Sequence, residues 1–331
     1  MEQLVAGGEQ ATIQPAHADY MLHLALRARR GLMGPAQAEW VERLESEHHN
    51  LRAALTWALD VDETELALRL CAVLTTFWYN KGYYREGRDW CARALAAAPN
   101  GPPARRAAVL FGMASLSDIQ HDHAEARAQV EASVALWRTV GDRRGLANSL
   151  ALLGMMARHA RDWAAARQAC EEALAIYAES PEPWGQRLAL GVLGWVAEDQ
   201  GDHATARGLL EESLAAARSG GSPIDIALQL NNLGIVAMRE GDANEAALRH
   251  REALRLARDV DAREPMACAL EGLAGVAAAR GVHQDAAWLL GAAAELRSVI
   301  GAPRIAQFEE EYAQLLPRVE EQLGEDTFAA A

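Results

Sequence analysis

The sequence lacks several features that mark common classes of protein. Only 6% of its 331 residues are aromatic, and Val, Ile and Thr are sparse beside Ala and Leu, which favours helix over sheet. The longest apolar runs, such as residues 150–157, fall far short of the ~20 residues of a membrane-spanning helix. Residues 1–14 are acidic and polar and do not resemble a signal peptide. We therefore expect a cytoplasmic protein that contacts no membrane.

Cysteine and lysine are also scarce. The four cysteines, Cys71, Cys91, Cys170 and Cys268, form no CxxC pair, which fits a reducing compartment and argues against a disulfide framework or a zinc knot. Lys81 is the only lysine, and it lies in no Gly-rich phosphate loop, so we expect that this chain is not itself an ATPase. No Ser/His/Asp or Cys/His nucleophile pairing is apparent. We predict a protein that is not an enzyme and uses no cofactor.

Positive charge is in deficit as well. The chain has 46 acidic and 32 basic residues, which gives a net charge of −14. Phosphate contacts would therefore meet net repulsion, and no basic recognition helix is visible. We predict that this segment does not bind nucleic acid directly.

The sequence does contain a forty-residue repeat. A small residue recurs once in each unit, a turn follows eight residues later, an alanine twelve residues later, and a second small residue after a further seven. The first small residues are Ala114, Gly154, Gly194, Gly234 and Ala274, and the alanines are Ala126, Ala166, Ala206, Ala246 and Ala286. An earlier copy with Thr75 and Gly82 is offset by one residue and makes six units.

The repeat predicts a stack of helix hairpins. Small residues belong where two helix backbones approach closely, and a Gly-Asp pair, as at Gly241-Asp242, ends one helix and caps the next. A hairpin of this kind cannot bury its apolar face alone, so the units must stack. The stretch Asn232-Leu233-Gly234, followed by Gly241-Asp242, Ala246 and Ala253-Leu254, resembles the tetratricopeptide repeat, although that unit usually has ~34 residues.

The N-terminal block from Trp40 to Ala58 narrows the resemblance. Together with Phe77-Trp78, Gly82 and Glu86-Gly87-Arg88, it closely resembles the segment after the ATPase module in bacterial signal-transduction ATPases of the STAND class. Those proteins carry LuxR-type, antibiotic-regulator-type or cyclase domains, and their repeats are similar to those of the maltose-regulon activator. The resemblance, over residues 17–328, implies a sensor or scaffold region, either a fragment of such a regulator or a stand-alone relative.

The predicted fold is an all-α, right-handed α-solenoid. We expect a linker over 1–16, a helical pair over 17–60, six repeats over 61–300, a capping helix over 301–324 and a tail over 325–331. The helix from Pro303 to Leu323 is amphipathic, with Phe308 on its apolar side, and we expect it to cap the last repeat. A helix that forms a homodimer is the alternative.

Two polar clusters suggest a metal site, and in both a structural role is favoured. Glu45 and His49 are i,i+4 neighbours, a spacing that can ligate metal, but no third ligand is evident. We expect the polar residues of this block to bridge to the first repeat. His121 and His123 flank Asp122, but the repeat places Asp122 in a helix-capping position shared with Asp162. We therefore predict no metal ion.

The concave groove is the candidate binding site. The tetratricopeptide resemblance implies that the first helix of each unit lines it, at positions three before and one, four and five after the small residue. These positions carry both apolar and charged side chains, which favours recognition of a protein or peptide partner; a small-molecule sensor that controls an attached module is the alternative. The candidates are Tyr79, Asn80, Phe111, Asp118, Met155, Arg158, His159, Trp195, Glu198, Asp199, Asn231, Ile235, Met238 and Arg239, with Ser115, Ile119 and Glu271 beside them.

Overall fold

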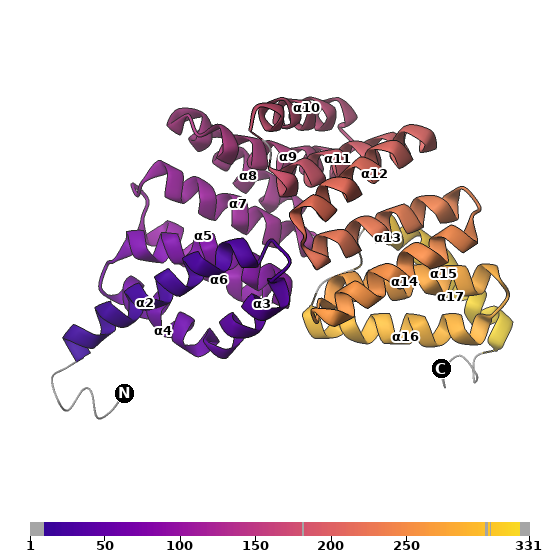
Figure 1. Ribbon diagram of the computed structural model, residues 1–331, viewed down its shortest axis with the longest axis horizontal. Coiled ribbons are helices and arrows are strands. Elements are labelled where there is room, and N and C mark those ends of the chain that lie inside the picture. Colours follow the sequence, from indigo (N-terminus) through magenta and orange to yellow (C-terminus); the bar gives the residue numbers. More distant parts are fainter. Residues whose placement is uncertain (1–9, 181, 302–303, 305, 325–331) are drawn as a thin grey trace.

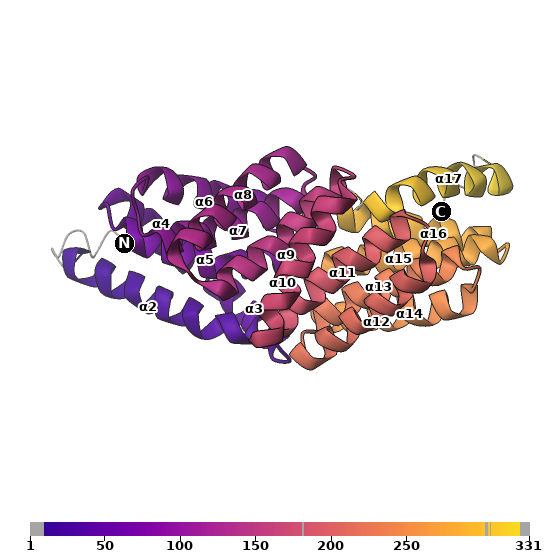
Figure 2. The ribbon, with the colours of Figure 1, turned by 90° about the horizontal axis from the view of Figure 1, so that it is seen from above.

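The computed structural model describes residues 10–180, 182–301, 304 and 306–324, and every regular element in these ranges is a helix. The predicted all-α class is therefore confirmed. Figure 1 shows the helices arranged as an arch, with α2–α6 on one side, α8–α12 at the crown and α13–α17 on the other side. Figure 2 shows the same helices from above, in an elongated row.

Six helix hairpins form the body of this α-solenoid, as the forty-residue repeat predicts. Each hairpin packs on the next, so the apolar face that one unit exposes is covered by its neighbour. The hairpins are α5 (Thr64–Lys81) with α6 (Tyr84–Ala97), α7 (Pro103–Ile119) with α8 (His123–Val140), α9 (Arg143–His159) with α10 (Trp163–Glu179), α11 (Pro183–Asp199) with α12 (His203–Gly220), α13 (Pro223–Arg239) with α14 (Ala243–Asp259), and α15 (Arg263–Ala279) with α16 (His283–Ile300).

Three helices precede the hairpins, where the sequence suggested a pair. They are α2 (Gln10–Gly31), α3 (Gln37–Ser46) and α4 (His48–Asp60). The helix α2 begins inside the segment 1–16 that was expected to be a linker, whereas residues 1–9 lie outside the described residues. The break between α3 and α4 falls at Glu47, in the middle of the Trp40–Ala58 block.

The turns inside the hairpins follow the predicted chemistry in most units. Gly201, Gly241 and Gly281 have φ between 77° and 84°, in the left-handed region that ends a helix without a steric penalty. The aspartate that follows, as at Asp202, accepts a hydrogen bond from the backbone three residues on. Asp122 departs from the expectation, because its carboxylate pairs with Arg88 and makes no capping hydrogen bond.

The small residues lie at close crossings of the two helices of a hairpin. A Cβ added to Gly154 would be 2.4 Å from Cys170 Sγ and 3.2 Å from the carbonyl oxygen of Ala166. Gly194 meets Leu210 in the same way. The alanine twelve residues after the glycine therefore marks the same crossing, which explains why both positions of the repeat stay small.

The arch closes on itself through contacts between segments far apart in the sequence. Gln37, at the start of α3, is buried, and its Oε1 accepts hydrogen bonds from Ser222 Oγ (3.3 Å) and the Ile224 backbone N–H (3.2 Å). Lys81 pairs with Asp261 across a distance of 3.4 Å. These contacts join the N-terminal helices to the α12–α15 region, so the first helices of the units enclose a central space.

The last helix, α17 (Ala306–Leu323), packs on the final hairpin through Val319, which is buried with Ala278, Ala286 and Ala287. The prediction that a C-terminal helix covers the last repeat rests on this contact; the side chain of Phe308 and the position of Pro303 lie outside the described residues.

Within the described ranges, we found no helix that combines the length and the apolar character needed to cross a lipid bilayer.

Candidate functional site

The enclosed space is a cavity of about 620 Å³ lined mainly by the first helices of the hairpins. It receives side chains from α5, α7, α9, α11 and α13, and from α2 of the N-terminal block. This is the face that the tetratricopeptide resemblance implies for the groove. The volume lies within the range of ~300–1,000 Å³ of pockets that hold small ligands or peptide side chains.

The fourteen candidate residues fall into three groups. Half of them line the large cavity, three line a second cavity of about 280 Å³ between α13, α15 and α17, and four line neither. The first group is Tyr79, Asn80, Phe111, Asp118, Met155, His159 and Trp195, the second is Ile235, Met238 and Arg239, and the third is Arg158, Glu198, Asp199 and Asn231. Ser115 and Ile119 also line the large cavity, and Glu271 the small one.

The members of the third group pair with residues of the neighbouring unit. Arg158 donates to Asp199 through Nε (2.7 Å) and Nη2 (3.1 Å), and its side chain is only 7% exposed. Glu198 accepts from Arg239, which lies 41 residues later, at 3.1 Å. The residue four after one small position thus pairs with the residue five after the next. These charges tie consecutive units together and do not face the cavity.

Trp195 is a core residue at the cavity wall. Its ring is 2% exposed and packs with Ile235 and Cys268, while the guanidinium carbons of Arg158 and Arg239 lie 5.4 and 5.9 Å from its centroid. The ion-paired arginines therefore hold the ring by cation–π contacts. A structural role accounts for this residue better than direct ligand contact.

Two polar atoms of the cavity lining have no hydrogen-bond partner in the described structure. They are Nδ2 of Asn80 on α5 and Oε2 of Glu264 on α15. Burial raises the pKa of Glu264 above its ordinary value, and the nearby Arg297 offsets only part of this. Buried polar groups are nearly always hydrogen-bonded, so a donor and an acceptor left open in one cavity point to a missing partner.

An ion pair and an aromatic ring complete this wall. Arg187 Nε lies 3.1 Å from Asp225 Oδ1, with both side chains nearly buried, and its guanidinium carbon is 5.7 Å from the ring of Trp184. Trp184 in turn makes an edge contact with Phe111 at 5.8 Å. The cavity therefore combines aromatic surface with fixed charges of both signs.

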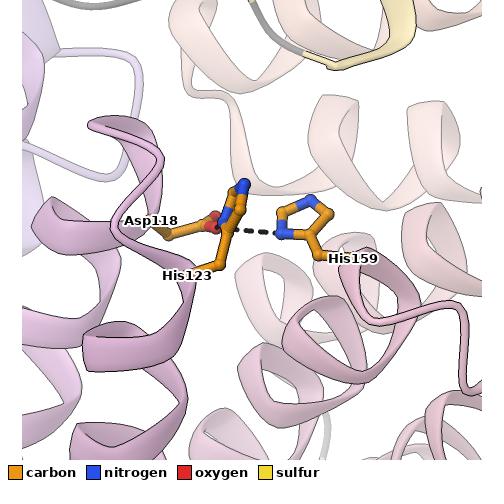
Figure 3. Close-up of side chains that lie close together, drawn as sticks. All are labelled: Asp118, His123 and His159. Carbon is orange, nitrogen blue, oxygen red and sulfur yellow. Dashed lines mark hydrogen bonds and ion pairs between the residues drawn. The ribbon is translucent and has the colours of Figure 1, made fainter.

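Three potential metal ligands converge at the edge of the same cavity. Nδ1 of His123 and Nδ1 of His159 each lie 3.2 Å from Oδ1 of Asp118, as Figure 3 shows. The three ligand atoms lie within 4.8 Å of one another. Burial alone would raise the pKa of Asp118, but the two imidazoles outweigh this effect, so the pKa lies below its ordinary value.

The N-terminal polar cluster bridges to the first repeat, as expected. Glu45 accepts a hydrogen bond from the Tyr83 hydroxyl at 2.6 Å, and Glu86 interacts with His48 at 3.0 Å and with Arg52. Burial would raise the pKa of Glu86, but hydrogen bonds from Arg52 and His48 lower it to about 2. His49, the proposed i,i+4 partner of Glu45, lies beyond the helix break at Glu47.

Several residues of the cavity were missed by the sequence analysis. Glu264, Arg187, Asp225 and Trp184 lie at or near the starts of their helices, whereas the groove positions were taken from the middle and end of each first helix. No motif marks them. The pairing of Asp118 with His159 did leave a signal, because these residues are 41 apart and occupy the positions that Arg158 and Asp199 occupy one unit later.

Comparison with known proteins identifies the repeats. Residues 105–179 and 145–219 match the family model of the tetratricopeptide repeat, so the chain contains tetratricopeptide repeats. A stretch of 93 residues, 27% of the chain, is 34% identical to a protein of Mycobacterium tuberculosis described as an HTH-type transcriptional regulator. The match spans about 10% of the length of that relative.

Solved structures support the fold over nearly the whole chain. The STAND protein with a tetratricopeptide repeat sensor from Pyrococcus horikoshii is 14% identical, with a TM-score of 0.59 over 84% of this chain and 41% of its own. NprR in complex with its cognate peptide NprX is also 14% identical, with a TM-score of 0.58 over 90% of this chain and 82% of its own. The resemblance to the repeat regions of bacterial regulators is thereby confirmed for fold and repeat family.

Proposed function

We propose that this chain, an array of tetratricopeptide repeats, is a non-enzymatic binding module of a bacterial regulator that takes a peptide or a protein segment into its central cavity. The observation that carries the proposal is the unpaired donor of Asn80 and the unpaired acceptor of Glu264 in one cavity. A peptide backbone carries both an N–H donor and a C=O acceptor, so it can satisfy both.

The shape of the lining also favours a peptide. The small-molecule alternative called for a closed pocket around Trp195, Arg158 and Asp199, but only Trp195 lines the cavity. The cavity instead extends over first helices from five consecutive units. An extended ligand with several side chains makes use of such a surface, and NprR, which shares the fold, is solved with a peptide bound.

Binding would act on the shape of the array. The cavity walls come from different units, so a ligand that contacts several of them stabilises one curvature relative to others. A coupling of ~1–3 kcal/mol is typical between two sites of a regulator and suffices to shift an associated ATPase or DNA-binding module. In this proposal, contact with DNA belongs to other parts of the regulator, because the chain carries a net charge of −14.

Peptide selection tests the proposal. A pool of random octapeptides is passed over the immobilised chain, and enriched peptides are identified by mass spectrometry and measured by fluorescence anisotropy. The variant Asn80→Leu removes the unpaired donor at nearly constant volume. We expect it to weaken binding of the enriched peptides about tenfold, because it removes one hydrogen bond in a dry site.

The matched control is Asn100→Leu, in the loop between α6 and α7, where Asn100 is exposed. It makes the same chemical change away from the cavity and should leave binding unchanged. The proposal fails if no peptide is enriched, or if enriched peptides bind the Asn80→Leu variant as tightly as the original chain. Because the substitution removes an unsatisfied buried donor, it should not lower the free energy of unfolding.

A further inference from the structure

We propose that Asp118, His123 and His159 bind a divalent transition-metal ion, with zinc as the best match. Two imidazole nitrogens and one carboxylate oxygen are typical zinc ligands. Zinc bonds of ~2.0–2.1 Å in a tetrahedral site place neighbouring ligand atoms about 3.3 Å apart. The structure has both imidazole nitrogens 3.2 Å from the same carboxylate oxygen, so little movement is needed to accept the ion.

Hydrogen bonding within the chain does not fully account for this cluster. His123 makes a hydrogen bond to Asp118, but Nδ1 of His159 is buried and has no partner in hydrogen-bond geometry, although Asp118 Oδ1 is 3.2 Å away. Leaving such an atom unpaired costs free energy. A metal ion at the point where the three atoms converge would accept the lone pair of this nitrogen.

The position of the cluster leaves one side of the ion open. Asp118, His123 and His159 all line the large cavity, and the ring of His121, which also lines it, lies 5.2 Å from the ring of His123. Three protein ligands with an open fourth position are a common arrangement for zinc. Solvent or a group of a bound ligand would complete the coordination from the cavity side.

The ion would also join two consecutive units. Asp118 lies at the end of α7 and His123 at the start of α8, whereas His159 is the last residue of α9 in the next hairpin (Figure 3). A bond network across this joint restrains the angle between the two units. The inference is independent of the peptide proposal, since it rests on these three side chains alone.

The chain contains an internal comparison for this site. Eighty residues later, Glu198 and His203 occupy the positions of Asp118 and His123, and their side chains lie 2.8 Å apart. The position of His159 is taken by Arg239, which pairs with Glu198 at 3.1 Å. An arginine cannot give up its proton to ligate a metal, so this second site should not bind the ion.

Isothermal titration calorimetry with zinc chloride tests the proposal on the full chain without an affinity tag, after treatment with EDTA. We expect one ion per chain, and cobalt(II) bound in its place should show the visible absorption of tetrahedral coordination. Loss of a residue that only supports a ligand costs ~10–100-fold in affinity, so Asp118→Asn and His159→Gln should each weaken zinc binding at least about 100-fold. The control His203→Gln should leave the affinity unchanged.

Circular dichroism separates loss of the site from loss of the fold, and Asp118→Asn keeps the size of the side chain. Zinc should also raise the melting midpoint of the original chain but not that of His159→Gln. The proposal is overturned if the EDTA-treated chain takes up no zinc, or if His203→Gln weakens binding as much as His159→Gln does. Equal affinity in Asp118→Asn and the original chain would also overturn it.

Discussion

Acidification should destabilise the fold through His250, a fully buried residue of α14. Burial lowers the pKa of its imidazole from 6.5 to about 4. The Asn231 side chain donates to the carbonyl of Pro265 and presents its oxygen to His250 Nδ1 at 3.0 Å, so Nδ1 carries the proton. Nε2 has no partner and points at Gly234 and Gly272, where an added N–H would find no acceptor.

The magnitude follows from linkage between protonation and folding. The unfolded chain takes up a proton near pH 6.5, but the folded chain does so only near pH 4. Stability is therefore complete above pH 6.5 and is lost as the pH falls toward 4. At pH 5 the loss is ~2 kcal/mol, and the limit below pH 4 is ~3.4 kcal/mol.

Urea denaturation at pH 7.5 and pH 5.0 measures the loss, with EDTA present to remove metal ions. The variant His250→Gln keeps a donor for Asn231 and cannot be protonated, so contributions from all other groups cancel in the comparison. We expect the original chain to lose ~2 kcal/mol more than the variant between the two pH values. Equal losses in the two proteins would refute the assignment of a neutral, buried His250.

Three further substitutions test the packing. Gly154→Ala should destabilise by ~1–3 kcal/mol, because the new methyl group meets Cys170 Sγ at 2.4 Å, whereas Gly208→Ala, with open space on α12, should stabilise by ~0.5–1 kcal/mol; thermal melts distinguish the signs. Trp195→Ala should cost ~3–5 kcal/mol in urea unfolding, as expected of a core residue, and a cost under 1 kcal/mol would contradict its burial. Gln37→Ala should speed amide hydrogen exchange at Ile224, and unchanged exchange would show that their contact does not hold the arch closed.

The repeat alone predicted most of the fold. Small residues at a fixed spacing imply close helix crossings, and the contact of Gly154 with Cys170 bears this out. The closure of the arch left no such signal, because Gln37 and Ser222 are 185 residues apart and belong to no common pattern. Such a contact depends on the accumulated curvature of all intervening units, which the sequence of any one unit does not fix.

The candidate site was predicted in part for the same reason. Positions counted from the small residue find side chains that point away from the partner helix, and Tyr79 and Phe111 accordingly line the cavity. The same count cannot separate a residue that faces the cavity from one that pairs with the next unit. Arg158 and Glu198 are of the second kind, because each has an opposite charge at the matching position 41 residues away.

That pairing rule explains where a new site can arise in this array. The residue four after one small position meets the residue five after the next, and in two successive joints the pair is an arginine with a carboxylate. In the joint between α7 and α9 the same two positions hold Asp118 and His159, and His123 adds a second imidazole. An arginine in this joint would give another ion pair and a fixed angle between the units. The histidine keeps a lone pair available, and so it makes the rigidity of this joint depend on a metal ion.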